Sequence, residues 1–346
     1  MQEIDQRDRE LLAALQSDVP LLSTPFAVIG QMIDMSEKEV IKRTERLKRD
    51  GIVRQISAVF EPRALGYRTC LVAARVEGER VDEAAACISA HPGVTQNYRR
   101  NHDFNLWFTL NIAPTSRLGL DRTIEILGEQ SGTAAMRALP TLKLYKAANH
   151  ELADGHTSDS EHPHGEDSNP PVTTDEIEAV RLLQADLPLQ PRPFDVLART
   201  HGTIGADQLL SSAKAMVGRQ QLRRFGAIVH PRKGGFTATA MAVWHVPQNK
   251  ADEYGAKMAG HRAVSHCYLR PTYDDWQFNL FTTVHGRSVD ECESVIHDLS
   301  IDTGLRDGRT LYPTKEYKRE RIQLFAPELD AWEASHVGST VQSAVS

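Results

Sequence analysis

The chain has 346 residues and a formal net charge of −6 at pH 7, a length that predicts two or more domains, each able to bury a core. The negative balance excludes a general polyanion-binding protein, so any site for an anionic ligand must be a local basic patch. Four widely spaced cysteines without a CxxC pair, a charged N-terminus and the lack of a long apolar run predict a cytoplasmic protein without a disulfide framework, a structural zinc site or a membrane span.

Residues 1–60 are predicted to form a winged helix-turn-helix domain. Apolar residues at helical spacing predict a first helix over 3–17, and Pro25 lies where the first turn of a second helix tolerates it. Ser36, followed by acidic residues, is the expected N-cap of a third helix, and Gly51 is the expected glycine just after its end. A strand follows to Phe60. Three short helices and a strand ribbon are the pattern of a winged helix-turn-helix.

Residues 61–148 are predicted to form a ferredoxin-like domain. Alternation and helical periodicity place a strand, a helix, two strands, a helix and a last strand in that order. The order βαββαβ is the ferredoxin-like arrangement. The predicted ranges are 68–76, 80–90, 94–100, 104–112, 116–130 and 136–146.

Residues 149–174 are predicted to be a flexible linker, because they are polar, rich in Pro, Gly, Ser and Asp, and nearly free of large apolar residues. Four histidines lie in this segment. A flexible ligand set has little preorganisation for a metal ion, so no metal site is predicted.

The pattern then restarts, which indicates a tandem duplication of the same two-part unit. Asp18–Leu21 returns as Asp186–Leu189. Residues 175–232 are predicted to be a second, degraded winged helix-turn-helix, because Gly202, Gly205 and Gly218 are expected to break up its third helix. Residues 233–325 are predicted to be a second ferredoxin-like domain, and residues 326–346 a frayed tail. The predicted fold class is therefore α+β, a tandem duplication of a winged helix-turn-helix followed by a ferredoxin-like domain.

The duplication also repeats two shorter signals in the ferredoxin-like regions. Pro140-Thr141 returns as Pro313-Thr314, and residues 97–109 (NYRRNHDFNLWFT, the first tip) share Tyr-x-Arg and Phe-Asn-Leu with residues 267–282 (CYLRPTYDDWQFNLFT, the second tip). Alternation from Phe104 onward predicts a strand with one buried face, so the polar residues before it stand where a strand pair turns. A single copy is most simply a solvated hairpin tip, but two copies that keep both motifs favour a functional site.

Residues 36–67 (SEKEVIKRTERLKRDGIVRQISAVFEPRALGY) resemble the leucine-responsive (Lrp/AsnC) regulator family, in which a winged helix-turn-helix precedes a ferredoxin-like effector domain. The two tips, in turn, resemble the two subunit types of the sirohaem (siroheme) decarboxylases, which share that fold. Both types stand here in one chain, first-subunit type before second-subunit type, as in the fused form of haem d1 biosynthesis. This resemblance covers nearly all of the chain except the linker and tail.

The resemblance implies removal of carbon dioxide from the C12 and C18 acetate side chains of sirohaem to give 12,18-didecarboxysirohaem, in haem d1 or alternative haem biosynthesis. It implies no organic cofactor, because the macrocycle accepts electron density and brings its own iron. The implied partners are sirohaem and other enzymes of the tetrapyrrole pathway, with no membrane and no specific DNA. The chain would be a fused pseudo-heterodimer that further dimerisation could extend.

The residue types at the tips suit this chemistry. Arginine pairs carboxylates bidentately, aromatic side chains wall a flat ring, and a histidine delivers a proton near neutral pH. Arg99 alternates out of phase with Arg100, whose repeat partner is Arg270, so Arg100 is the one expected to face the site. The residues assigned to catalysis are Arg100, His102 and Tyr273, and those assigned to substrate binding are Tyr98, Arg99, Trp107, Lys143, Tyr268, Arg270, Trp276 and Lys315.

Several alternatives stay open at this point. Trp107 suits the core of a sheet as well as a ligand wall, and His102 could ligate the sirohaem iron instead of delivering a proton. A transcription regulator that binds DNA through residues 38–49 and senses a tetrapyrrole is the main rival function, and a carrier without chemistry is a third. The regulator is disfavoured because DNA-reading dimers need two equivalent recognition helices.

Overall fold

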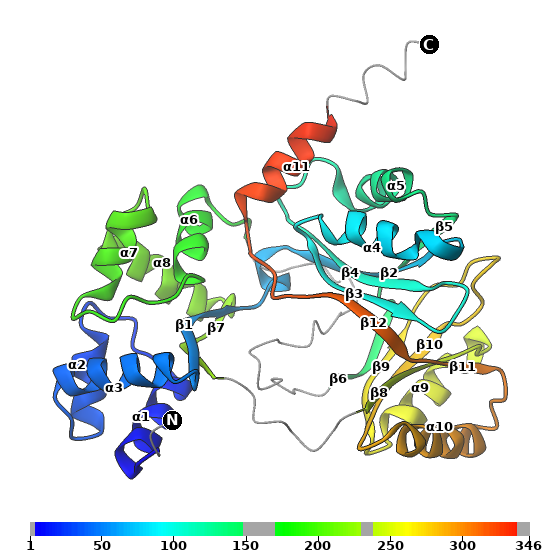
Figure 1. Ribbon diagram of the computed structural model, residues 1–346, viewed down its shortest axis with the longest axis horizontal. Coiled ribbons are helices and arrows are strands. Elements are labelled where there is room, and N and C mark those ends of the chain that lie inside the picture. The colour runs from blue at the N-terminus through cyan, green and yellow to red at the C-terminus, as the bar shows by residue number, and fades with distance from the viewer. Residues whose placement is uncertain (1–3, 148–169, 230–237, 338–346) are drawn as a thin grey trace.

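The computed structural model describes residues 4–147, 170–229 and 238–337. They form two lobes, one of helices from both halves of the sequence and one of two sheets with their covering helices (Figure 1). From the helical lobe, β1 leads directly into the sheet lobe (Figure 1).

The first helix-turn-helix forms as predicted. Its helices are α1 (Gln6–Ser17), α2 (Pro25–Met32) and α3 (Glu37–Arg49), and they lead into β1 (Val53–Phe60). The Ser36 hydroxyl accepts a hydrogen bond from the Glu39 amide at 3.2 Å, as an N-cap does. After α3, Gly51 has a φ of 72°, a left-handed conformation that glycine adopts without a steric penalty.

The second helix-turn-helix is complete, so the expectation of a helix broken up by glycines was wrong. It contains α6 (Thr174–Leu183), α7 (Pro193–His201), α8 (Ala206–Gly218) and β7 (Leu222–Val229). The 13 residues of α8 equal the 13 of α3. Gly205 is the N-cap of α8 and Gly218 its last residue, and glycine costs little at a helix end.

The strand after each helix-turn-helix pairs with its own repeat. β1 and β7 form a two-stranded antiparallel ribbon. In a wing hairpin both strands come from one continuous segment, whereas here each half of the chain supplies one strand. The buried apolar residues of both helix-turn-helix units belong to one continuous core, which includes Leu15, Ile56, Phe194 and Phe225. The two copies therefore form one unit, because they share this core and, among the residues that the structure describes, β1 and β7 pair only with each other.

Both ferredoxin-like domains form in the predicted order of elements. The first contains β2 (Arg68–Arg75), α4 (Val81–Ser89), β3 (Val94–Arg100), β4 (Leu106–Ile112), α5 (Gly119–Ser131) and β5 (Ala135–Leu139). The second contains β8 (Ala238–Trp244), α9 (Ala251–Ala259), β9 (Val264–Leu269), β10 (Leu280–Gly286), α10 (Val289–Thr303) and β11 (Gly308–Leu311). Short 3₁₀ turns lie at Arg63–Leu65, Gly78–Arg80 and Gln248–Lys250.

The last predicted strand of each domain is in fact two strands in two different sheets. β5 stays in the first sheet, whereas β6 (Lys143–Ala147) pairs with β9 of the second half. In the same way β12 (Pro313–Arg319) leaves the second half and pairs with β3. The sheet orders are β12-β3-β4-β2-β5 and β11-β8-β10-β9-β6. Prolines at the change of sheet, Pro140 and Pro313, lack the N–H that a continuous strand would need.

The two five-stranded sheets pack face to face, with the helices on their outer faces (Figure 1). A third cluster of buried side chains, which includes Leu71, Trp107, Val243 and Phe281, fills the space between the sheets. As a result β4 is buried on both faces along its whole length. The prediction of one buried face was wrong, because the second copy of the domain covers the other.

Two further predictions concern the segments at the domain borders. The linker of residues 149–174 lies largely outside the described residues, and α6 already begins at Thr174. The frayed tail was wrong for part of its length, because residues 327–337 form α11 (Pro327–Val337) beside α5 (Figure 1). Trp332 of α11 packs edge-on against His91 with ring centroids 4.3 Å apart.

We expect this contact to make the stability of the fold depend on pH. Burial, with smaller contributions from the charges of Lys318 and His336, lowers the pKa of His91 to about 3, whereas an unfolded histidine titrates near 6.5. Below about pH 6.5 His91 is protonated in the unfolded chain but stays neutral in the folded chain. The free energy of unfolding therefore falls as the pH drops below that value. At about 1.4 kcal/mol per pKa unit, the difference between 6.5 and about 3 corresponds to at most roughly 5 kcal/mol.

Urea unfolding at pH 7.5 and pH 5 measures this effect, with His91→Asn as the control. The His91 Nδ1 accepts a hydrogen bond from the Gly93 amide at 3.0 Å, and an asparagine oxygen can accept the same bond without titrating. The variant should lose less stability between the two pH values than the wild type. An equal loss in both proteins would show that His91 is not the group responsible.

Candidate active site

Each tip is fixed to its sheet by an asparagine. At the first tip the Asn105 Nδ2 donates to the Val76 carbonyl at 2.8 Å, and its Oδ1 accepts from the Val76 amide at 3.1 Å. At the second tip Asn279 makes the same two bonds to Val246, at 2.8 and 2.9 Å. The repeated Phe-Asn-Leu motif therefore has a structural reason, because its asparagine ties the hairpin to the neighbouring strand.

The repeated arginines reach across from one half to the other. Arg100 Nη1 donates to the Leu311 carbonyl at 3.0 Å, and Arg270 Nη1 donates to the Leu139 carbonyl. Leu139 and Leu311 are the last residues of β5 and β11, where the chain is about to change sheets. Arg270 is only 4% exposed, whereas Arg100 is half-buried. Both arginines thus hold the strand exchange in place.

The two tips meet between the sheets. The His102 ring of the first tip lies edge-on to Trp276 of the second, with centroids 5.4 Å apart, and Phe104 lies 5.6 Å from the same indole. Trp276 is 1% exposed, and its Nε1 has no hydrogen-bond partner among the described residues. An unpaired buried N–H costs free energy, so this position suits a ligand or water that accepts its hydrogen bond.

His102 is held in one orientation by its own loop. Its Nδ1 accepts a hydrogen bond from the Phe104 amide at 3.0 Å, so the neutral ring carries its hydrogen on Nε2. The pKa of His102 lies below its ordinary value, chiefly because the ring is partly buried. The charge of Asp103 opposes this shift, and the charge of Arg309 adds to it. The ring therefore borders the apolar cluster, and its protonation is influenced by a charge from each half, Asp103 and Arg309.

The extra residues of the second tip form a tight turn that lies on the first sheet. The Tyr273 amide donates to the Trp276 carbonyl at 2.7 Å, and the Tyr273 hydroxyl donates to the Ala138 carbonyl at 2.5 Å. Asp275 accepts two hydrogen bonds from Arg137 of β5, at 2.8 and 2.9 Å. The turn is therefore anchored by Tyr273 and Asp275, and burial raises the pKa of the Tyr273 hydroxyl.

The assigned lysines lie on the helix side of the sheets, away from the meeting point of the tips. Lys143 pairs with Asp252 of α9 at 2.7 Å, and Lys315 pairs with Asp82 of α4 at 3.0 Å. Arg99 is exposed and lies near Asp82, whose pKa it helps to lower. Arg100 faces the other side of β3, as the alternation predicts. The two lysine ion pairs connect each exchanged strand, β6 and β12, to a helix that covers the sheet it joins.

The assigned aromatic residues differ in burial. Trp107 is 1% exposed and donates from Nε1 to the Phe104 carbonyl at 2.7 Å, so it belongs to the core between the sheets. Tyr268 is also buried and lies under Arg270, 4.9 Å from ring centroid to guanidinium carbon. Tyr98 is half-buried beside Arg100, at 5.9 Å. Only a rearrangement of the tips would bring Trp107 or Trp276 against a flat ring.

Sequence reasoning missed three arginines that surround the tips. Arg75 lies 5.6 Å over Phe104, Arg137 lies 5.3 Å over Tyr273, and Arg309 lies 5.7 Å over Phe278. Arg137 and Arg309 occupy the same place in the duplication, two residues before the repeated leucines 139 and 311. That repeat was available as a signal, but the contact of Arg137 with Tyr273 of the other half follows only from the packing of the two halves.

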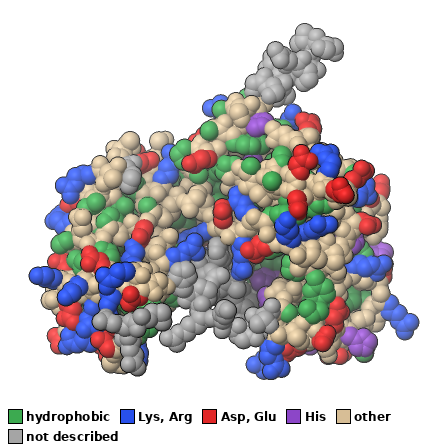
Figure 2. Space-filling view, in the orientation of Figure 1, with side chains coloured by type: hydrophobic (Ala, Val, Ile, Leu, Met, Phe, Trp, Pro, Cys, Tyr) green, Lys and Arg blue, Asp and Glu red, His purple; other side chains and the backbone are tan. Residues whose placement is uncertain are grey.

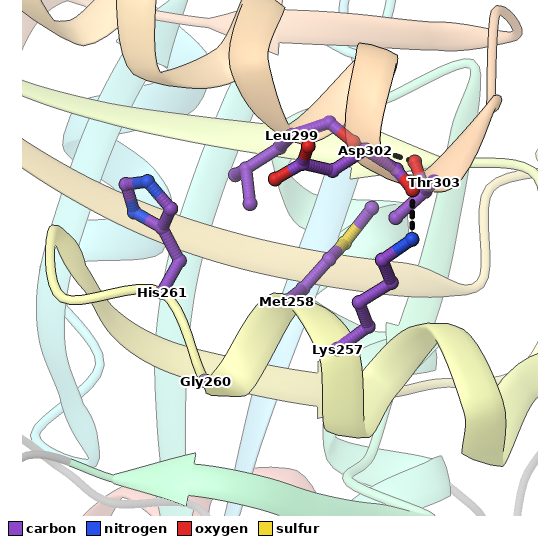
Figure 3. A pocket seen from close by; sticks show the side chains of 7 residues that line it. All are labelled: Lys257, Met258, Gly260, His261, Leu299, Asp302 and Thr303. Atoms are coloured by element: carbon purple, nitrogen blue, oxygen red, sulfur yellow. Dashed lines mark hydrogen bonds between the residues drawn. The ribbon is translucent and has the colours of Figure 1, made fainter.

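A cavity of about 210 Å³ lies elsewhere, between α9 and α10 (Figure 3). His261, Met258 and Asp302 are among its lining residues. Its volume is below the range of roughly 300 to 1,000 Å³ usual for ligand pockets, and it lies on the helix side of the second sheet. It is therefore no site for a tetrapyrrole.

The basic residues of α3 are largely neutralised within the domain. Arg43 contacts Asp8 at 2.8 Å and Asp5 at 2.9 Å, and Arg46 also pairs with Asp8, whose side chain is fully buried. Lys48 pairs with Asp186 of the second half. On the visible face of this lobe, Lys and Arg side chains lie among Asp and Glu side chains (Figure 2). The helix that would read DNA thus presents a mixed surface.

We therefore expect weak, salt-sensitive and sequence-independent binding to duplex DNA, because few lysines and arginines remain to displace counterions from phosphates. Fluorescence anisotropy with duplexes of different sequence, at about 50 and 150 mM salt, measures it. Lys42→Ala, which removes an exposed cation of α3, should weaken binding equally for every duplex. Nanomolar affinity for one defined duplex at the higher salt would contradict this expectation.

Comparison with known proteins agrees with this architecture. Residues 64–146 and 233–318 match the AsnC-like ligand binding domain, and residues 8–54 match the siroheme decarboxylase NirDL-like HTH domain. A siroheme decarboxylase of Hydrogenobacter thermophilus is 34% identical over 93% of this chain and 96% of its own length. The crystal structure of the siroheme decarboxylase NirDL in complex with an iron-uroporphyrin III analogue matches with a TM-score of 0.76 and 31% identity, over 97% of this chain and all of that one.

Shorter relatives match one half at a time. A siroheme decarboxylase beta subunit of Methanosarcina barkeri is 35% identical over 43% of this chain and 97% of its own length. An alpha subunit from Desulfovibrio desulfuricans is 38% identical over 42% of this chain and 82% of its own length. The fold and the exchanged strands thus define a single-chain version of a two-subunit enzyme with AsnC-like domains. The chain belongs to the siroheme decarboxylase family and is a carboxy-lyase.

Proposed function

We propose that this protein removes carbon dioxide from the C12 and C18 acetate side chains of sirohaem and releases 12,18-didecarboxysirohaem. The observation that carries the proposal is the meeting of the two tips, where His102, an unpaired indole N–H and the guanidinium groups of Arg75 and Arg309 border one aromatic cluster. Relatives across nearly the whole chain carry the name siroheme decarboxylase.

The chemistry replaces each carboxylate by a hydrogen. The bond between the methylene carbon and the carboxylate breaks, carbon dioxide leaves, and the electron pair stays on the methylene carbon, where the conjugated ring spreads it. A proton then adds to that carbon and leaves a methyl group. The protein has to bind several carboxylates, exclude water and supply the proton, and these tasks call for guanidinium groups, apolar walls and a histidine.

His102 is our choice for the proton carrier. Since Nδ1 accepts from the Phe104 amide, Nε2 is the atom that bears hydrogen and can pass it on once the ring is protonated. Carboxylates of a bound ring would favour that protonated form by raising the pKa of His102. Proton delivery from the imidazolium and iron ligation through Nε2 both place a hydrogen on Nδ1 and give up the bond from the Phe104 amide, and we choose proton delivery because the reaction consumes one proton for each carboxylate lost.

We further propose that no organic cofactor takes part and that the iron enters only with the substrate. Among residues 4–147, 170–229 and 238–337, no group of three His, Cys, Asp or Glu side chains could hold a metal ion, and no helix has the length and apolarity that a membrane crossing needs. All four cysteines are free thiols, which supports a reducing compartment such as the cytoplasm. Other enzymes of the tetrapyrrole pathway, in haem d1 or alternative haem synthesis, are the proposed neighbours.

Anaerobic incubation of the purified protein with sirohaem, followed by mass spectrometry of the tetrapyrrole, tests the proposal. Loss of the mass of two carbon dioxide molecules per ring is the expected result, because each acetic acid side chain becomes a methyl group. A ring that binds but keeps its mass would mean a carrier, and a ring that does not bind would remove sirohaem as the substrate.

A further inference from the structure

Arg137 and Arg309 occupy equivalent positions in the duplication, and their surroundings differ. Arg137 of β5 lies over Tyr273 of the second tip, which belongs to the other half. Arg309 of β11 lies over Phe278 of the second tip, and the Phe278 ring packs against Trp276, the residue that His102 contacts, with ring centroids 5.2 Å apart. The residue after Arg309, Thr310, accepts a hydrogen bond at its carbonyl from Asn101 of the first tip at 3.4 Å, so Arg309 lies where the two tips meet. A pseudo-twofold arrangement of this kind offers two places at which a ring carboxylate could meet a guanidinium group.

The place at the second tip is already filled by the protein. The Asp275 carboxylate accepts from Arg137 Nε at 2.8 Å and from Nη2 at 2.9 Å, while Nη1 donates to the Met136 carbonyl at 3.0 Å. All three nitrogens of this guanidinium are thus engaged. Arg137 and, more weakly, Arg75 lower the pKa of Asp275, so the carboxylate stays ionised and paired at neutral pH.

The place at the first tip is open. The Arg309 side chain is 58% exposed, against 31% for Arg137. Among the described residues it donates one hydrogen bond, to the neighbouring Gly308 carbonyl at 2.7 Å, and it lies 3.8 Å from Asp307, beyond hydrogen-bond distance. No carboxylate holds it as Asp275 holds Arg137.

The charges at the first tip suit an anionic ligand between the two halves. Arg309 and His102 are close enough for the arginine to lower the pKa of the imidazole, which means that the pair disfavours a second positive charge. A carboxylate bound between them would remove that repulsion and stabilise the imidazolium. The same carboxylate would receive a charge-assisted hydrogen bond from the guanidinium.

We propose that Arg309 binds a carboxylate of the tetrapyrrole beside His102, and that the equivalent place at Arg137 is closed by Asp275, so that the chain has one working tip. This inference rests on the proposed function. It assigns the reaction to the tip of the first half and makes the second half the source of the carboxylate-binding arginine. It follows that one ring binds per chain, although the duplication provides two related places.

The matched variants Arg309→Ala and Arg137→Ala test the proposal in the full-length protein. Binding is followed anaerobically by absorbance titration with iron-uroporphyrin III, a ring with eight carboxylates, and turnover is followed with sirohaem. Arg309→Ala should weaken binding about tenfold, the effect of one charge-assisted contact, and Arg309→Lys should restore part of it, because lysine keeps the charge but not the fork. Arg137→Ala should change affinity by less than about twofold while lowering the melting temperature.

The stoichiometry and the ring chemistry give two further readings. The wild type should bind one iron-uroporphyrin per chain, and the loss in Arg309→Ala should shrink with iron-coproporphyrin, which has fewer carboxylates. Equal weakening by both alanine variants, an unchanged affinity in Arg309→Ala, or two rings per chain would overturn the proposal. If these binding results hold but sirohaem keeps its mass, the decarboxylase function fails while the arginine assignment stands.

Discussion

Replacement of His102 by alanine should slow carbon dioxide release about a hundredfold or more, which is the usual cost of losing a general acid, while sirohaem still binds. The ring carries its hydrogen on Nε2 at the point where the two tips meet, and no other histidine lies in either tip. Single-turnover kinetics under anaerobic conditions, with binding measured separately, distinguish the two effects. The wild-type rate should fall as the pH rises and His102 loses its proton, and this dependence should disappear in the variant.

Tyr273→Phe is the comparison for this experiment. The Tyr273 hydroxyl donates to the Ala138 carbonyl, so its removal should cost about 1 kcal/mol of stability and much less turnover than the loss of His102. The opposite outcome, in which Tyr273→Phe abolishes turnover and His102→Ala retains it, would reverse the roles of the two tips.

The second large effect is expected from Arg270→Ala, which should lower the free energy of unfolding by about 3 kcal/mol. The buried guanidinium donates to the Leu139 carbonyl and lies 4.9 Å from the Tyr268 ring and 5.2 Å from the Phe281 ring. A hydrogen bond from a charged donor is worth roughly 1.5 to 3 kcal/mol, and a desolvated cation–π contact about 2 kcal/mol. Urea unfolding at pH 7.5 measures the change. Arg270→Lys should recover part of it.

Arg306→Ala, which removes an exposed arginine of the same half, is the control and should change stability by less than about 0.5 kcal/mol. From the sequence, Arg100 was assigned to catalysis and Arg270 to substrate binding, and a lost charge-assisted contact to a ring carboxylate would instead weaken substrate binding by roughly ten- to a hundredfold. If Arg270→Ala is as stable as the wild type and only binds sirohaem more weakly, that earlier interpretation is correct and the arginine acts on the substrate.

The fold class was predictable because its signals are local. Ser36 and Gly51 mark the ends of α3, and the order of strands and helices in residues 68–139 follows from periodicity alone. The exchange of β6 and β12 was not predicted, since pairing between distant strands leaves no local pattern. The repeated Pro-Thr pairs at 140 and 313 were its only trace, and a proline shows where a strand ends but not which sheet the chain joins next.

The candidate site was predicted in part for the same reason. The tips were found because they repeat, and His102 and Trp276 do come together. The repeated arginines were interpreted as ligands, whereas the structure uses them to hold the crossing between halves. Arg137 and Arg309 were missed although they repeat, because their sequence positions do not show that Arg137 packs over Tyr273 of the other half or that Arg309 lies over Phe278.

The most direct test of the central claim is turnover of sirohaem in deuterium oxide, without oxygen, with the product weighed at intervals. The account predicts a ring that loses two carboxyl groups as carbon dioxide and gains one deuterium in each methyl group so formed, because the proton on His102 exchanges with solvent. His102→Ala should give the same product far more slowly. A wild-type product that retains both carboxyl groups after prolonged incubation would contradict the account.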